Sequence, residues 1–174
     1  CIESLGGDVC MTSENHQTGT DRMYEALQVI DPGKMIHYII NLQGDLPTIN
    51  SMALEKVLNL LSSEEDEMGT LVTQFEREED LKKEQFVKAV CNLSGSKTES
   101  YAENFLRKQG DYESKNLFHH IGIYSFKRDA LEKFVTLSQT DREKNEKLEQ
   151  LRALDNNMKI KIGLIDFLPL GVDT

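Results

Sequence analysis

The stretch Met35-Ile-His-Tyr-Ile-Ile-Asn-Leu-Gln-Gly-Asp45 begins with an apolar run of strand length and ends on a glycine and a carboxylate. The run is apolar on both faces, which predicts a central strand of a sheet covered on both sides. In an open α/β sheet, ligands bind where parallel strands end at their carboxyl edge. Asp45 at that edge would suit a hard cation that carries phosphates, although Gly-Asp after a strand is also an ordinary turn.

The rest of the chain alternates between strand and helix patterns. Further strands are predicted over residues 68–75, 86–93, 119–126 and 158–165, the last as an edge strand or one with an exposed face. Helices are predicted over residues 20–30, 50–61, 130–135 and 142–156, while residues 98–116 show no regular pattern. This alternation predicts an α/β layered fold in a single domain of 174 residues.

Composition excludes several classes of function. The formal net charge of −10 disfavours binding to nucleic acid or to an anionic membrane, and no apolar run is long enough for a transmembrane helix. The three cysteines have no paired spacing, so they offer no zinc site and are typical of a reducing compartment. Because the N-terminus also lacks the features of a secretory signal, the expected location is the cytoplasm.

Polar residues follow or interrupt several of these elements. Asp173 comes after the last strand, and it could share one Mg²⁺ with Asp45 if both strands point the same way. His120 and Tyr124 share one face of a strand, either as ligand-binding groups or as a half-buried packing pair. Glu149 and Gln150 lie beside a leucine stripe and could equally be solvated residues. The loop at Thr18, Gly19 and Thr20 could attract an anion or simply cap a helix.

Five motifs occur in this order along the chain: Gly7–Ser13 with His16–Arg22, Asn41–Asp45, His120–Tyr124, Glu146–Arg152 and Gly171–Thr174. Together they resemble the motifs of the 3-deoxy-manno-octulosonate cytidylyltransferases, also called CMP-Kdo synthetases. The similarity spans nearly the whole chain, and the leucine-rich helix motif together with the final motif separates it from the related sialic acid cytidylyltransferases.

The resemblance implies a Rossmann-like nucleotidyltransferase fold of the nucleotide-diphospho-sugar transferase type, with a mixed sheet and helices on both faces. It implies an enzyme that activates 3-deoxy-D-manno-octulosonate (Kdo) with CTP for lipopolysaccharide synthesis. Asp45 and Asp173 would act in catalysis by holding Mg²⁺. His120, Tyr124, Glu149 and Gln150 would contact the sugar acid, and Gln43 with Thr18, Gly19 and Thr20 the nucleotide. A sugar-binding and dimerising insertion would lie within residues 86–126, and the intact enzyme would be a homodimer.

The chain also departs from the family pattern. The family begins with a strand and an Arg- and Lys-bearing loop for the CTP phosphates, so we expect a chain that is truncated at its N-terminus and that lacks a closing C-terminal helix. Leu46 stands where the family usually has Glu. Glu103 stands where the family has an Arg that faces the substrate, with Arg107 as a substitute if the register shifts.

Two alternatives follow from these departures. One is a catalytically inactive remnant of the enzyme, favoured by the changes at Leu46 and Glu103 and by the expected truncation. The other is a different sugar nucleotidyltransferase, such as a sialic acid cytidylyltransferase.

Overall fold

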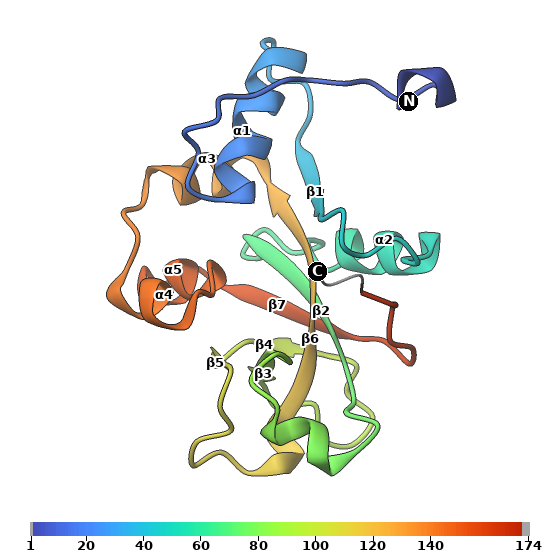
Figure 1. Cartoon of the computed structure of the whole chain (residues 1–174), viewed down its shortest axis with the longest axis vertical. Helices are drawn as coiled ribbons and strands as arrows, with labels where there is room; N and C mark the ends of the chain where they lie inside the picture. The colour runs from blue at the N-terminus through green and yellow to red at the C-terminus, as the bar shows by residue number, and fades with distance from the viewer. Residues whose placement is uncertain (1, 172–174) are drawn as a thin grey trace.

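The computed structural model describes residues 2–171, which form a mixed sheet flanked by helices (Figure 1). The strands are β1 (Tyr38–Leu42), β2 (Met68–Thr73), β3 (Lys88–Val90), β4 (Glu99–Tyr101), β5 (Asn104–Leu106), β6 (Leu117–Lys127) and β7 (Ile160–Leu164). The α-helices are α1 (Gly19–Ile30), α2 (Ser51–Asn59), α3 (Arg128–Thr136), α4 (Asp141–Glu146) and α5 (Gln150–Asp155), and short 3₁₀ turns lie at Glu3–Leu5, Glu78–Lys82 and Ser114–Asn116.

The sheet is built around the long strand β6. The strand order is β4-β7-β2-β6-β3-β5, and β1 pairs with the C-terminal half of β6. Strands β1 and β2 both run antiparallel to β6, and β7 runs parallel to β2. Therefore β1 and β7 point the same way. Their carboxyl ends lie toward the same edge of the sheet, which is required if Asp45 and Asp173 are to share one metal ion.

Helices cover both faces of this sheet, as predicted. One core cluster joins Leu27 of α1, Leu131 of α3 and Leu151 of α5 to one face. A second cluster joins Ala53, Val57 and Leu60 to the opposite face. The two predicted helix starts are real: Thr18 Oγ1 accepts a hydrogen bond from Asp21 N at 3.2 Å, and Asn50 Oδ1 accepts one from Ala53 N at 3.0 Å.

The prediction of β1 as a central strand is wrong within the described residues. β1 pairs with β6 alone, and Tyr38 and Leu42 are 52% and 43% exposed. Its apolar run is nevertheless explained, because Ile39 packs into one core cluster and Ile40 against the other. Apolar residues on both faces of a strand indicate that other layers cover both faces of the sheet. They do not indicate how many strands pair with it.

The prediction of β7 as an edge or half-exposed strand is also wrong, since β7 lies between β2 and β4. Its alternating lysines suggested an exposed face. The amine of Lys161 instead pairs with Oδ2 of the fully buried Asp66 at 3.0 Å, and Tyr101 in β4 donates a hydrogen bond to Oδ1 of Asp66 at 2.6 Å. β4 and β5 themselves lie in the region without a predicted element, because each is only three residues long and β4 is largely exposed.

The long helix predicted over residues 142–156 is two short helices. Lys147, between α4 and α5, adopts a left-handed backbone with φ of 54°. The leucine stripe of Leu148, Leu151 and Leu154 lies wholly after Lys147, so its spacing could not reveal the break. The left-handed residue turns the chain and sends Glu149 and Gln150 toward the sheet.

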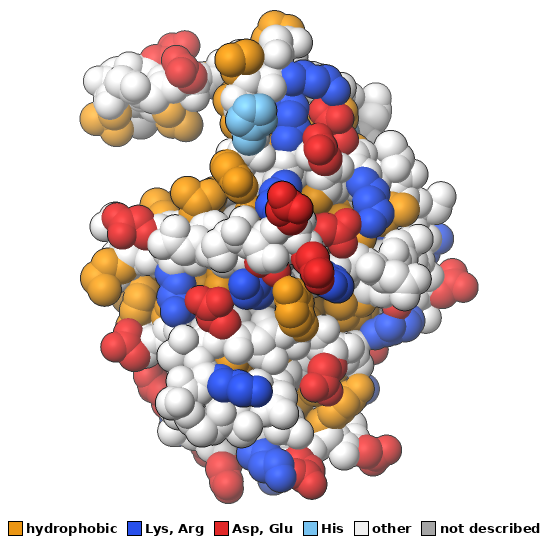
Figure 2. Space-filling view, turned by 180° about the vertical axis from the view of Figure 1, so that it is seen from behind, with side chains coloured by type: hydrophobic (Ala, Val, Ile, Leu, Met, Phe, Trp, Pro, Cys, Tyr) orange, Lys and Arg blue, Asp and Glu red, His pale blue; other side chains and the backbone are white. Residues whose placement is uncertain are grey.

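The outer surface carries both signs of charge. Figure 2 shows acidic and basic side chains interspersed over the face that it presents, with apolar side chains exposed between them. Over residues 2–171, no helix is long and apolar enough to cross a membrane.

Candidate functional site

Most of the predicted site residues surround one hollow of about 590 Å³. Six of them line it: Gln43, Asp45, His120, Tyr124, Glu149 and Gln150. They come from the loop after β1, from β6 and from the start of α5, three segments that the sheet topology brings together. Thr18, Gly19 and Thr20 are absent from the described lining of this hollow.

The loop after β1 forms one wall. Asp45 is exposed there, and the chain that leaves β7 returns to this loop. Thr48 Oγ1 accepts a hydrogen bond from Leu170 N at 2.7 Å, and a side chain added at Gly171 would come within 3.8 Å of the Asp45 carbonyl oxygen. Asp173 lies outside the described residues, two positions beyond Gly171.

Asp45 is a suitable partial ligand for a hard metal ion. An exposed carboxylate at the carboxyl end of a strand can bind Mg²⁺ while the ion keeps several of its waters. Among the residues that the structure describes, no three His, Cys, Asp or Glu side chains are grouped to hold a metal ion. The described residues therefore offer one ligand of the predicted pair.

His120 is held as a neutral imidazole. Part of its surface faces the hollow, yet desolvation by the surrounding protein lowers its pKa to about 3, and neighbouring His119 acts in the same direction. Its Nε2 lies 3.0 Å from Thr70 Oγ1, which also contacts the carbonyl oxygens of Ile121 and Ile123 at 3.3 and 2.8 Å.

These contacts assign the tautomer of His120. Carbonyl oxygens only accept, so the single hydroxyl hydrogen of Thr70 is donated to a carbonyl, and the hydroxyl oxygen accepts from Nε2–H. Nδ1 is then unprotonated and can accept a hydrogen bond. A neutral acceptor of this kind suits a sugar hydroxyl and does not suit an anion.

Tyr124 and Glu149 both line the hollow, and the charge of Glu149 affects the ionisation of Tyr124. Burial raises the pKa of Tyr124 well above its ordinary value, and the charge of Glu149 raises it further. Burial also raises the pKa of Glu149, although the Thr18 and Thr20 side chains and Arg152 oppose that change. The loop at the start of α1 therefore reaches the site through Glu149, even though it does not line the hollow.

Within the described residues, Glu149 Oε1 is a buried side-chain oxygen without a hydrogen-bond partner. Arg152 Nη2 lies 4.0 Å from it, beyond hydrogen-bonding distance. A buried acceptor left unsatisfied is costly to the fold and suits a bound hydroxyl donor.

Several lining residues are ones to which the sequence pattern gave no role or only a conditional one. Within the described lining, the Arg and Lys residues are Arg107 and Lys147. His119, which also lines the hollow, stacks on Phe75 with ring centroids 5.1 Å apart. Glu103, at the position where the resemblance expects an Arg, is exposed and is not part of the described lining. The sequence predicted a site role for Arg107 only in a shifted register. It predicted no role for Lys147, because no feature of the sequence marks its left-handed backbone.

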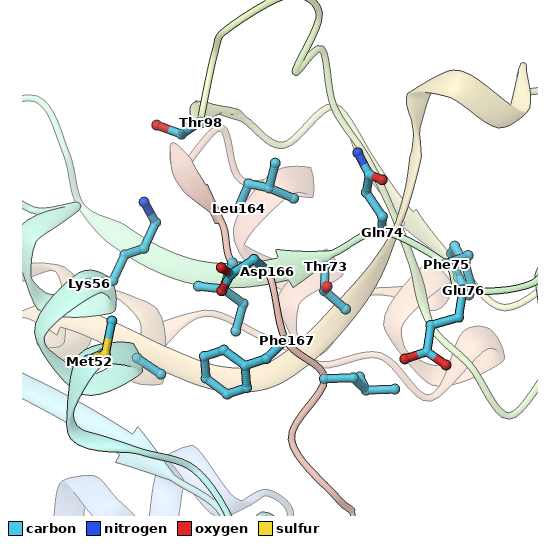
Figure 3. Close-up of a pocket in the computed structure, with 13 residues that line it drawn as sticks. Met52, Lys56, Thr73, Gln74, Phe75, Glu76, Thr98, Leu164, Asp166 and Phe167 are labelled. Carbon is cyan, nitrogen blue, oxygen red and sulfur yellow. The ribbon is translucent and has the colours of Figure 1, made fainter.

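A second hollow of about 700 Å³ is lined in part by the chain that leaves β7 (Figure 3). Lys56, Asp166 and Phe167 are among its lining residues, and Leu168 lines both hollows. The described lining of this second hollow contains none of the predicted site residues. The candidate site is therefore the hollow around His120.

The comparisons with known proteins show the family of this chain. The chain matches the family model described as "Cytidylyltransferase" over residues 1–160. It is 42% identical to the 3-deoxy-manno-octulosonate cytidylyltransferase of Rhizobium etli (strain CIAT 652) over 99% of this chain and 68% of the relative. It is 43% identical to the protein of the same name from Bartonella quintana (strain Toulouse), over 99% and 71%. A solved structure of CMP:2-keto-3-deoxy-manno-octonic acid synthetase complexed with CTP superposes with a TM-score of 0.85 at 28% identity, covering 99% of this chain and 70% of the other.

Proposed function

Because this chain belongs to the 3-deoxy-manno-octulosonate cytidylyltransferase family, we propose that it transfers a cytidylyl group from CTP to Kdo, giving CMP-Kdo and pyrophosphate. The observation that supports this most is the convergence of Gln43, Asp45, His120, Tyr124, Glu149 and Gln150 on one hollow. In sequence these residues are separated by as much as 107 positions, counted from Gln43 to Gln150.

The sugar-acid end of the site would be the wall formed by β6 and the start of α5. His120 offers Nδ1 as an acceptor, and Glu149 offers an unsatisfied oxygen, so both suit the hydroxyl groups of an eight-carbon sugar. Tyr124 and Gln150 line the same wall and would complete the polar contacts.

The nucleotide end would be the loop after β1 together with the start of α1. Gln43 lines the hollow, and Thr18, Gly19 and Thr20 form the N-terminus of a twelve-residue helix, where backbone N–H groups favour phosphate. Asp45 and Asp173 would hold Mg²⁺. When bound there, the ion would neutralise phosphate charge and acidify the attacking hydroxyl.

The reaction is an in-line displacement at phosphorus. The anomeric hydroxyl oxygen of the sugar forms a bond to the α-phosphorus of CTP and loses its proton to solvent. The bond from that phosphorus to the bridging oxygen breaks, and pyrophosphate leaves. Such transfers depend chiefly on positioning and on neutralising developing charge. The chain's own contribution is to orient the sugar hydroxyls, exclude water from the hollow and set the sugar oxygen opposite the leaving group.

The biological setting follows from that product. We place the enzyme in the cytoplasm and in lipopolysaccharide synthesis, and we propose that the intact family enzyme is a homodimer whose contacts include residues 86–126. The overall charge of −10 supports a small-molecule substrate in preference to nucleic acid.

Replacing the proposed metal ligand tests this function. Asp45→Asn should lower the rate of pyrophosphate release from CTP, Kdo and Mg²⁺ by about two orders of magnitude, because loss of a metal carboxylate removes several kcal/mol of charge stabilisation. Asp111→Asn, at an exposed aspartate outside the hollow, is the matched control and should leave the rate unchanged. Absence of release from folded wild-type protein would favour the inactive remnant instead.

A further inference from the structure

Positive charge in the candidate site is concentrated on Arg107. Within the described lining, the Arg and Lys side chains are those of Arg107 and Lys147. The two lining histidines add little charge, since burial lowers the pKa of both His119 and His120. Lys147 is exposed and its flexible side chain makes no ion pair with the described residues, so Arg107 is the better fixed of the two cations.

The Arg107 guanidinium is fixed by backbone carbonyls. Nε donates to the Glu146 oxygen at 2.8 Å, Nη1 to the Glu84 oxygen at 3.3 Å and Nη2 to the Lys147 oxygen at 3.4 Å. Carbonyl groups hold a cation in place without cancelling its charge. Within residues 2–171, no carboxylate forms an ion pair with Arg107, so its full charge remains.

A count of donors shows what Arg107 still offers. A guanidinium has five N–H groups, and three are used by these carbonyls. The two that remain are one on each terminal nitrogen. An ionised carboxylate with two oxygens is the ligand that such a pair of donors binds best.

The backbone of Arg107 is fixed as well, by Lys88. The Lys88 side chain is fully buried in β3, and its amine donates to the carbonyl oxygens of Arg107 and Lys83, each at 2.6 Å. A buried amine is stable only where such acceptors satisfy it. This unusual arrangement holds the carbonyl of the very residue whose side chain lines the hollow.

We propose that Arg107 binds the carboxylate of the acidic sugar, with Lys88 as the positioning residue that fixes it. The proposal rests on the proposed function for the identity of the sugar. It also gives a physical account of Glu103, because an Arg at 103 would not be needed if Arg107, four positions further along the chain, supplies the cation.

Binding to a charged and an uncharged form of the sugar tests this proposal. The probes are Kdo and its C1 methyl ester, titrated by calorimetry into wild type, Arg107→Gln and Lys108→Gln. Lys108 is the adjacent exposed residue, paired with Glu84 at 3.4 Å, and serves as the matched control. Wild type and Lys108→Gln should prefer the acid. Arg107→Gln should bind the acid at least about tenfold more weakly and the ester unchanged.

A purely structural role gives a different pattern. Arg107 also holds the carbonyls at the α4–α5 junction, so its loss could displace Glu149 and Gln150. In that case Arg107→Gln would weaken the acid and the ester equally, and this result would overturn the proposal. Arg107→Lys should restore part of the preference for the acid, because it returns the charge without the planar pair of donors.

Turnover, measured separately, distinguishes this proposal from the proposed function. If Arg107→Gln loses the preference for the acid while wild type forms no CMP-Kdo, the function is wrong and the carboxylate site stands. If wild type turns over and Arg107→Gln keeps the same KM for Kdo, the function stands and the carboxylate site is wrong. Failure of wild type to bind Kdo at all would overturn the carboxylate site.

Discussion

The placement of the Glu149 carboxylate lowers the stability of the folded protein. Its side chain is 24% exposed, and within the described residues Oε1 has no hydrogen-bond partner. Burial disfavours its ionised form and so raises its pKa. Strained or unsatisfied groups of this kind are found disproportionately at functional sites, where a ligand satisfies them.

Glu149→Gln should therefore stabilise the free protein while reducing sugar binding. Because the pKa of Glu149 in the folded state is raised above its ordinary value of 4.5, the ionised group destabilises the fold above that pH and has no such effect below it. The free energy of unfolding of the variant should rise by about 1 kcal/mol at pH 8 and by little at pH 4. Denaturant titrations at the two pH values measure this, with Glu146→Gln as the control, and a variant less stable than wild type at pH 8 would contradict it.

His120 should remain neutral throughout the physiological pH range. Its pKa is lowered to about 3, so the folded state resists protonation, and the stability associated with the neutral ring is lost as pH falls from 6.5 through 3. NMR of ¹⁵N-labelled histidine should show Nε2 protonated and Nδ1 unprotonated at pH 7. An imidazolium signal from His120 at pH 6 would be incompatible with this account, and His120→Gln should flatten the loss of stability in acid.

Individual site residues were predictable to different degrees. Asp45 and His120 lie at or near strand ends, where an α/β sheet exposes side chains, and the motif order added their roles. Arg107 and Lys147 were not predictable with the same certainty, because their placement depends on a carbonyl network and on a left-handed backbone. Those features arise from tertiary packing and leave no mark on local spacing.

At the scale of elements, α4 and α5 are joined by a buried ion pair. Arg152 in α5 donates to both carboxylate oxygens of Glu143 in α4, at 2.9 and 2.6 Å, and their side chains are 2% and 4% exposed. The Arg152 guanidinium also lies 4.7 Å from the Phe134 ring centroid. This pair keeps the two helices together across the left-handed residue that separates them.

Breaking that pair should be strongly destabilising. Arg152→Met leaves the Glu143 charge buried and unpaired, so the free energy of unfolding should fall by about 3 kcal/mol. Arg142→Met removes an exposed pair with Asp155 and should cost less than about 1 kcal/mol. Adding Glu143→Gln to Arg152→Met should recover part of the loss, and a double variant no more stable than the single one would count against the pairing.

Elements with strong periodicity were predicted well, and weak or interrupted ones were not. α1 and α2 have clear caps and apolar stripes, and both were found within two residues of the predicted limits. β4 and β5 are too short to show a period. β7 was misplaced because the Asp66 that neutralises Lys161 lies 95 residues earlier in the chain.

At the scale of the whole molecule, one edge of β1 carries no partner strand among the described residues. An unpaired edge with exposed apolar side chains is a template for association with another chain. Wild type should elute from gel filtration as a large or heterogeneous species. Tyr38→Lys should reduce that association, whereas Val29→Lys, at a 63% exposed residue of α1, should not. Identical sharp elution of wild type and Tyr38→Lys would contradict this role of the edge.

The whole fold brings the loop after β1, strand β6 and the start of α5 to one hollow, and the chemistry proposed for that hollow has a defining product, CMP-Kdo. The most direct test is ³¹P NMR of folded protein incubated with CTP, Kdo and Mg²⁺. The account predicts loss of the CTP signals and growth of a phosphodiester signal and a pyrophosphate signal, the latter twice as intense because each pyrophosphate has two equivalent phosphorus atoms. Unchanged CTP signals, or pyrophosphate formed without the phosphodiester, would contradict it.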